Sequence, residues 1–150
     1  SLISRGPEER IFPVLEELGI SVTAYGVLSR GLLSGSVPAG KSDYRDHLPR
    51  FSGENLAHNQ RLAGELQRLA ADKGLSASQL AIAWVLAKTP RIIPLIGARK
   101  RSQLRDSLGS LAVVLSAEEI QHLEQMIRPE AAAGTRYDAF QMKHLDSEKR

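Results

Sequence analysis

The sequence predicts an α/β fold, a parallel sheet covered by helices, and three observations lead to this prediction. A short β-branched run at residues 20–25 follows a helical segment and a glycine. A second apolar run occupies residues 92–96 and precedes another helical segment. Two segments with helical spacing of apolar residues separate these runs, which is the kind of crossover that joins parallel strands.

The first helix is expected to begin at Pro7, because proline suits the first turn and the acidic residues after it face the positive end of the helix dipole. Apolar side chains then recur at helical spacing, although Pro13 removes one backbone donor. Gly19 stands where a helix commonly ends, so the run at 20–25 follows as a buried strand.

The middle of the chain is predicted to contain a loop and two helices. Residues 26–54 are rich in glycine, serine and proline and are expected to form a long loop with one short helical turn. An amphipathic helix is predicted over residues 55–73. Ser76 and Gln79 form a capping box that starts the next helix, which Pro90 ends.

The last third begins with the second strand, over residues 92–96. Pro94 needs an explanation there, because a central strand uses its backbone N–H groups. Ser102 is expected to cap the following helix, and Ser116 begins another one through a capping box. The tail from Pro129 is rich in alanine and glycine, then polar, and is expected to be poorly ordered alone.

The composition is that of an ordinary globular chain, with 42% hydrophobic and 25% charged residues among 150. The lack of cysteine excludes disulfides and thiolate metal ligands, and the four histidines show no metal-binding spacing. No apolar run reaches the roughly 18 residues of a membrane span. A net charge of +3 with 5% aromatic residues argues against a nucleic-acid surface. We therefore expect a cytoplasmic protein with no nucleic-acid, membrane or metal partner.

The first candidate site follows the strand at residues 20–25, where Tyr25 precedes the glycine-containing run 26–31. Ligands of parallel α/β folds bind at the carboxyl ends of the strands. An aromatic ring can stack on a planar heteroaromatic ligand, and small residues let backbone N–H groups approach a pyrophosphate. The alternative, a buried aromatic in a glycine-rich turn, is the commoner outcome for these residues alone.

The second candidate site lies between the strand at 92–96 and the next helix, where Gly97 precedes the cluster containing Arg99 and Lys100. Arginine and lysine beside the N–H donors of a helix N-terminus suit an anion. Asp106, one turn into the helix, can accept from an adenine amino group or a ribose. A solvated basic loop with a surface aspartate paired to arginine is an equally good interpretation.

Together, in this order, the two loops resemble the aldo-keto reductase superfamily. The run LGISVTAYGVLSRGLLSG at residues 18–35 is similar to its seventh strand and following loop. The runs IPLIGAR at 93–99 and QLRDSL at 103–108 are similar to its eighth strand and helix. Residues 2–5 and the helix from Pro7 resemble the end of the sixth strand and its helix. The resemblance covers residues 1–128 and leaves 129–150 as a C-terminal tail.

The resemblance implies a partial (β/α)8 TIM barrel, the C-terminal portion with strands six to eight, and NADP(H) as cofactor. It implies that Tyr25 stacks on the nicotinamide. The residues implied to line the rest of the cofactor are Gly26, Leu28 and Arg30 at the pyrophosphate, Gly97, Arg99, Lys100 and Gln103 near the 2′-phosphate, and Asp106 at the adenine. Gly26 replaces a usual serine, which removes a hydroxyl contact, and Ser107 replaces a usual asparagine, which weakens or removes one adenine contact.

The family reduces carbonyl groups with a tyrosine proton donor assisted by lysine, aspartate and histidine on the first four strands, and no tyrosine of this chain matches that context. No catalytic residue is therefore predicted, and we expect the chain alone to be inactive, with a small carbonyl substrate only when the missing half completes it. Two alternatives remain open: a truncated non-enzymatic homologue that forms a homo-oligomer over its open sheet edges, and a bare nucleotide-binding module.

Overall fold

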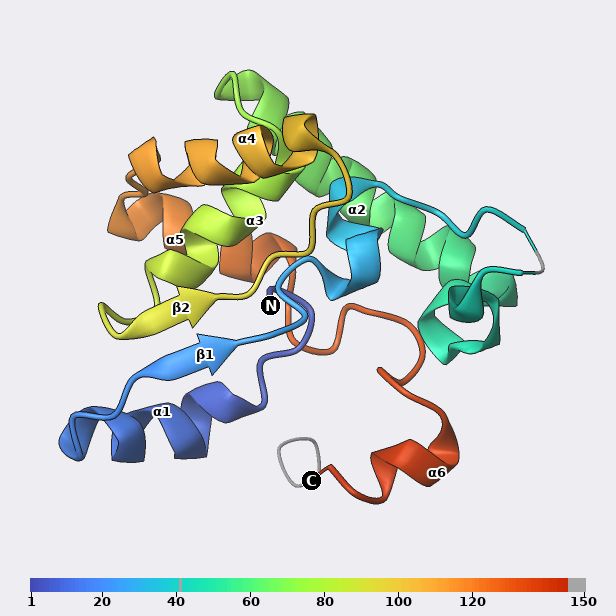
Figure 1. Cartoon of the computed structure of the whole chain (residues 1–150), viewed down its shortest axis with the longest axis horizontal. Helices are drawn as coiled ribbons and strands as arrows, with labels where there is room; N and C mark the ends of the chain where they lie inside the picture. Colours follow the sequence, from blue (N-terminus) through green and yellow to red (C-terminus); the bar gives the residue numbers. More distant parts are fainter. Residues whose placement is uncertain (41, 146–150) are drawn as a thin grey trace.

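The structure is a computed structural model that describes residues 1–40 and 42–145, and it places two short parallel strands among helices (Figure 1). The α-helices and strands follow the order α1 (Pro7–Glu17), β1 (Val22–Ala24), α2 (Gly53–Asp72), α3 (Ala77–Leu86), β2 (Ile92–Pro94), α4 (Arg101–Gly109), α5 (Ala117–Met126) and α6 (Ala139–Met142). Short 3-10 helices lie at η1 (Ser29–Ser34), η2 (Tyr44–His47), η3 (Pro49–Phe51) and η4 (Ser110–Ala112).

The two strands pair in parallel, with Val22 opposite Ile92 and Ala24 opposite Pro94. At the ends of the ladder, Val22 N donates to Arg91 O at 2.7 Å and Leu95 N donates to Ala24 O at 2.8 Å. Because successive amides along a strand face opposite sides, the bond from Leu95 means that the Pro94 nitrogen faces away from β1. The missing N–H of Pro94 therefore costs this pair no hydrogen bond.

The hydrophobic core lies where α2, α3 and the loop after β1 meet. Trp84, Leu80 and Leu66 are almost completely buried, and Leu32 and Leu33 of η1 pack against them. Nearly the whole length of α3 is buried, which agrees with a helix that is apolar on all sides. The core thus fixes the loop after β1 as firmly as it fixes the helices.

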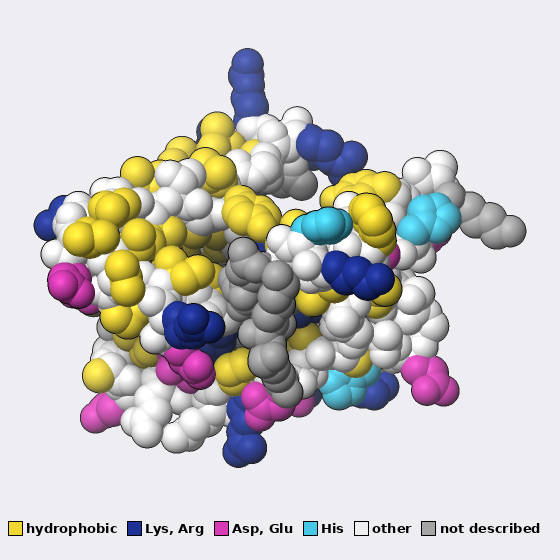
Figure 2. All heavy atoms as spheres, turned by 90° about the horizontal axis from the view of Figure 1, so that it is seen from below, with side chains coloured by type: hydrophobic (Ala, Val, Ile, Leu, Met, Phe, Trp, Pro, Cys, Tyr) yellow, Lys and Arg dark blue, Asp and Glu magenta, His cyan; other side chains and the backbone are white. Residues whose placement is uncertain are grey.

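Large apolar side chains remain exposed on both outer helices that flank the sheet. On α1 these include Ile11 and Val14, and on α4 they include Leu104 and Leu108. Figure 2 shows hydrophobic side chains gathered over a broad part of one face of the molecule. An exposed apolar area of this kind commonly marks a surface that contacts further protein. No helix among the described residues combines the length and apolar character that crossing a bilayer requires.

The predicted start of α1 at Pro7 is confirmed, and two of the three predicted serine caps agree with the structure. The capping boxes at Ser76 and Ser116 are confirmed, each serine oxygen accepting from the backbone N–H three residues later. The predicted cap at Ser102 is wrong, because α4 already begins at Arg101. The side-chain oxygen of Gln103 instead accepts from the backbone of Lys100 at 3.0 Å, which satisfies a free donor at the helix start.

The segment predicted as one long loop contains the helices η1, η2 and η3, and α2 begins two residues earlier than expected. The guanidinium of Arg45 links several parts of this segment. It donates to Arg30 O at 3.0 Å, to Ser36 Oγ at 3.1 Å and to Asp43 Oδ2 at 2.7 Å. The hydrogen bond from Arg45 holds the pKa of the Asp43 carboxyl well below its usual range. A single guanidinium therefore orders much of the segment between η1 and η2.

Residues 131–137, which we call the tail segment, are held by contacts with the rest of the chain. The expectation of poor order is therefore wrong for this segment. Asn59 of α2, only 1% exposed, donates to Ala133 O at 2.9 Å and accepts from Ala133 N at 2.8 Å. Arg50 donates to Gly134 O at 3.3 Å. A side chain on Gly134 would meet Pro49 O at 2.7 Å, so only glycine permits this close approach. The tail segment is thus fixed by residues far away in sequence.

We predict that Asn59→Ala lowers the free energy of unfolding by about 1–3 kcal/mol, because it leaves buried backbone groups of Arg50 and Ala133 without their partner. Urea unfolding followed by circular dichroism measures this loss. Gln60→Ala, on the exposed side of the same helix, is the matched control and is expected to change stability by less than about 0.5 kcal/mol. Equal stabilities of the two variants would contradict the prediction.

Candidate functional site

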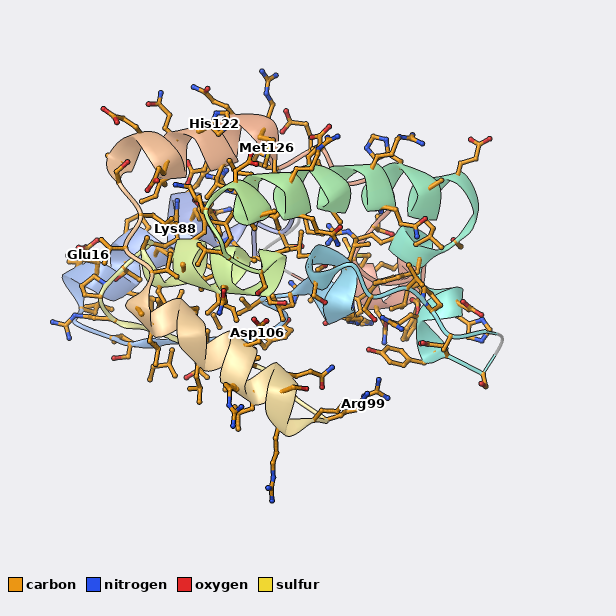
Figure 3. All side chains as sticks on the ribbon, turned by 90° about the horizontal axis from the view of Figure 1, so that it is seen from above. Glu16, Lys88, Arg99, Asp106, His122 and Met126 are labelled. Carbon is orange, nitrogen blue, oxygen red and sulfur yellow. The ribbon has the colours of Figure 1, made fainter. Side chains whose placement is uncertain are left out.

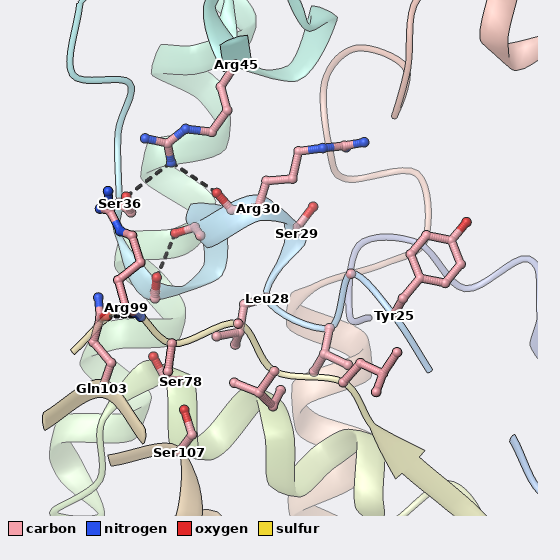
Figure 4. Close-up of a pocket in the computed structure, with 18 of the residues that line it drawn as sticks. Tyr25, Leu28, Ser29, Arg30, Ser36, Arg45, Ser78, Arg99, Gln103 and Ser107 are labelled. Carbon is pink, nitrogen blue, oxygen red and sulfur yellow. Dashed lines mark hydrogen bonds between the residues drawn. The ribbon is translucent and has the colours of Figure 1, made fainter. Parts of the chain in front are cut away.

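A cavity of about 1200 Å³ opens at the carboxyl ends of β1 and β2, where the two loops meet (Figure 4). It exceeds the roughly 300–1,000 Å³ of typical small-molecule sites. Eight of the nine residues singled out from the sequence line it, namely Tyr25, Gly26, Leu28, Arg30, Gly97, Arg99, Gln103 and Asp106. Lys100 is exposed beside Arg99 and is not part of the lining.

The first wall is the loop after β1, which turns sharply. Gly26 has φ +69°, a conformation that favours glycine, and this suits the departure from the serine of the resemblance. Ser29 and Arg30 also have left-handed backbones, with φ of 49° and 55°. For residues other than glycine this conformation costs about 1–2 kcal/mol each. Such a turn persists only where its surroundings enforce it.

Tyr25 stands at the entrance to this loop and is 56% exposed, so the alternative of a buried aromatic is wrong. The residue lines the cavity, and the guanidinium of Arg136 lies 4.7 Å from the centroid of its ring. An exposed aromatic residue with a cation at this distance can offer the rest of its ring to a planar ligand.

The second wall is the turn between β2 and α4. The side-chain oxygen of Gln103 accepts from the backbone N–H groups of both Arg99 and Lys100, each at 3.0 Å. In Figure 4 the side chains of Arg99 and Gln103 lie next to each other at one end of the cavity. At Gly97, apart from the residue itself and its two chain neighbours, no described atom lies within 4 Å of the position a Cβ would take. The turn is therefore ordered by Gln103 and open beside Gly97.

Asp106 lies one turn into α4, on the side toward α3, while Arg99 stands at the N-terminal end of the helix (Figure 3). Its carboxylate oxygen Oδ2 accepts from Ser76 Oγ at 2.8 Å. The alternative of a surface aspartate paired with arginine is therefore wrong. The capping serine of α3 orients this carboxylate at the cavity wall.

The charge of the wall is mainly positive. Four arginines line the cavity (Arg30, Arg45, Arg99 and Arg136) against the two carboxylates Asp43 and Asp106, and Asp43 is already paired with Arg45. Guanidinium groups in a partly enclosed space favour phosphate and carboxylate ligands. No cluster of three potential metal ligands occurs among residues 1–40 and 42–145.

Among the lining residues that the sequence did not indicate are Arg136 and Tyr137 of the tail segment. Arg30 donates to Arg136 O at 3.2 Å, and its guanidinium lies 4.5 Å from the centre of the Tyr137 ring. The only indication in the sequence is an arginine followed by a tyrosine within an alanine- and glycine-rich tail. This pattern does not predict where Arg136 and Tyr137 lie, because their position depends on Asn59 and Arg50, more than 70 residues away in sequence.

Comparison with known proteins identifies the family of the chain. Residues 1–128 match the Aldo/keto reductase family. The chain belongs to this family. A probable aldo-keto reductase 1 of Glycine max is 34% identical over 156 residues, which cover 98% of this chain and 44% of the relative. Members of the family carry out NADPH-dependent carbonyl reduction.

Two solved aldo-keto reductases share the fold of the chain. A glycerol dehydrogenase from Gluconobacter oxydans is 32% identical with a TM-score of 0.70, over 86% of this chain and 41% of that one. An aldo-keto reductase from Klebsiella pneumoniae, solved in complex with NADPH, is 26% identical with a TM-score of 0.59, over 91% of this chain and 40% of that one. The chain thus spans less than half the length of these TIM-barrel relatives.

The environment of Tyr137 generates a prediction about its ionisation. Burial raises the pKa of the phenol, but a hydrogen bond from Tyr25 and the charges of Arg136 and Arg30 outweigh burial and lower the pKa below its ordinary value. We expect Tyr137→Phe to remove this ionisation from an ultraviolet titration of tyrosinate, so that the difference between the two curves isolates Tyr137. Arg136→Met is expected to move the ionisation of Tyr137 to higher pH. A Tyr137 ionisation that Arg136→Met leaves unshifted would contradict the arrangement.

Proposed function

We propose that this chain is the C-terminal, NADP(H)-binding portion of an aldo-keto reductase barrel. The observation that carries the proposal is the convergence of the loops after β1 and β2 on one cavity with an excess of arginine. A phosphorylated dinucleotide needs both features, a long site with two ends and several cationic groups. The family membership and the NADPH held by the Klebsiella relative support the same cofactor here.

The residues present fit this cofactor. Tyr25 offers an exposed ring to the nicotinamide, and the turn from Gly26 to Arg30 provides small residues and a cation for the pyrophosphate. At the other end of the cavity, Arg99 lies beside the open space at Gly97, where a phosphate can approach the backbone. When bound, NADPH supplies the hydride for carbonyl reduction.

Lys100 and Asp106 would complete the adenosine end. Lys100 is exposed at the rim beside Arg99, where its long side chain can reach a 2′-phosphate in front of the turn. Asp106 is oriented by Ser76 and can accept a hydrogen bond from an adenine amino group. Gln103 contributes by fixing the backbone of the turn rather than by offering its amide oxygen, which is already used twice.

The chemistry of proton transfer would come from the rest of the barrel. The resemblance assigns the catalytic tyrosine, lysine, aspartate and histidine to the first four strands, and this chain carries the residues of strands six to eight. In this proposal a small carbonyl substrate binds only when both parts are present. The exposed apolar residues of α1 and α4 would then contact the other part of the barrel.

The same exposed apolar residues favour a second candidate, a non-enzymatic homologue that associates with itself. In that case the apolar surface on α1 and α4, and not the cavity, is the functional feature. The chain would then bind NADPH and NADH without a preference set by Arg99 and Lys100. Cofactor discrimination therefore separates the two candidates.

We predict that the chain binds NADPH at least about tenfold more tightly than NADH, because charge-assisted hydrogen bonds to the 2′-phosphate are worth about 1.5–3 kcal/mol each. Isothermal titration calorimetry measures both affinities. The double variant Arg99→Ala, Lys100→Ala is expected to lose the preference. Arg68→Ala, which removes an exposed cation of α2, is expected to keep it. Equal binding of the two cofactors by the unaltered chain, or no binding, would rule out the proposed function.

We also predict that the chain alone does not catalyse reduction. Absorbance of NADPH with 4-nitrobenzaldehyde as a broad substrate is expected to show only the background rate, because the chain has no tyrosine in the catalytic context of the family. Turnover well above a protein-free control would contradict the assignment of catalysis to the other part of the barrel. A bare nucleotide-binding module would give the same background rate even when the other part is added.

A further inference from the structure

The loop after β1 contains more strain than its own contacts explain. Two consecutive residues, Ser29 and Arg30, have left-handed backbones, although neither is glycine. The local bonds Ser29 N to Gly26 O at 2.8 Å and Gly31 N to Leu28 O at 3.0 Å close the turn but do not exclude less strained turns. A contact from outside the loop is needed to select this conformation.

The tail segment supplies such a contact at both ends of the loop. At Arg30 it provides the carbonyl oxygen of Arg136 as acceptor and the ring of Tyr137 as a stacking surface. At Tyr25 it provides the Arg136 guanidinium over the ring, 4.7 Å from its centroid. Arg136 also lies 5.3 Å from the Tyr137 ring centre, so the four side chains form one connected group.

The tail segment is itself anchored, which lets it act on the loop. Asn59 is bonded to both backbone groups of Ala133, and Arg50 is bonded to Gly134 O. His58 contacts Ala131 O at 2.8 Å. These three residues belong to η3 and α2, elements that also pack in the core. The position of Arg136 and Tyr137 is therefore fixed relative to the core and not only relative to the loop.

We propose that Arg136 and Tyr137 are positioning residues of the cofactor site: they hold Tyr25 and the turn at Arg30 in the conformation that receives the nicotinamide and pyrophosphate. This inference rests on the proposed function. It assigns to the tail segment a role at one end of the cavity only. The adenosine end, ordered by Gln103 and Ser76, does not depend on it.

Two ligands separate the two ends of the site. NADP⁺ would contact both, whereas adenosine 2′,5′-bisphosphate has no nicotinamide and would use only the turn at Arg99. Arg136→Met keeps the length of the side chain without its charge, and Tyr137→Leu keeps an apolar side chain without the ring. Each is expected to weaken NADP⁺ binding about tenfold in calorimetry, as expected for the loss of a cation–π contact. Each is expected to leave bisphosphate affinity within about twofold.

Two further variants test whether the specific contacts matter. Tyr137→Phe keeps the ring beneath Arg30 and is expected to restore most of the NADP⁺ affinity that Tyr137→Leu loses. Lys143→Ala removes an exposed cation later in the tail and is expected to bind both ligands like the unaltered chain. Thermal unfolding of each variant serves as the control that all of the compared proteins are folded.

The possible outcomes are distinct. Unchanged NADP⁺ affinity in both Arg136→Met and Tyr137→Leu would overturn the inference. An equal loss for both ligands would also overturn it, since it would indicate a general structural role. Tyr137→Phe binding as weakly as Tyr137→Leu would contradict the stacking contact. If the unaltered chain does not bind adenosine 2′,5′-bisphosphate, the proposed function itself fails, which is a different result.

Discussion

The parallel pairing of β1 with β2 is the constraint on which the site depends. Parallel strands end at the same edge of a sheet, so the chain must leave both strands on one side. Leu95 N bonds to Ala24 O at this edge, directly before the two loops diverge. An antiparallel pair would have placed Tyr25 and Arg99 at opposite edges. One short ladder therefore brings together residues more than 70 positions apart.

The site also depends on side chains that order the loops after the ladder ends. Arg45 bonds the backbone of the loop after β1, Gln103 bonds that of the turn before α4, and Asn59 bonds the tail segment. Each is a side chain whose polar atoms satisfy backbone groups of an irregular segment, which otherwise has no secondary structure to order it. These side chains thus hold the irregular segments that carry the arginines in place, and the cavity is preformed.

Local patterns predicted the elements well, because the physics that forms them is local. The capping boxes at Ser76 and Ser116 are fixed by neighbours within a few residues. The strand ends were less predictable, since β1 and β2 extend only as far as their backbones stay paired. The cap at Ser102 failed because α4 already begins at Arg101, where the side chain of Gln103 accepts from the backbone N–H of Lys100.

The tail segment was not predictable for the opposite reason. The residues from Ala131 to Tyr137 predict no regular element, and the position of the segment comes from Asn59 and Arg50 across the fold. The sequence identified the residue types that suit a phosphorylated cofactor, but the number of arginines sharing one cavity is a property of the tertiary structure. The resemblance to a known family supplied the proposed roles of Tyr25 and Arg99, which the local residues left open.

The most direct test of whether both loops form one site is a titration of the chain with NADP⁺ in which two-dimensional NMR records the chemical shifts of the backbone amides. If both loops form one site, shifts are predicted in residues 25–31 and in residues 97–103, and both sets saturate with a single dissociation constant. Shifts confined to one of these segments, or two segments that saturate with different constants, would contradict the account.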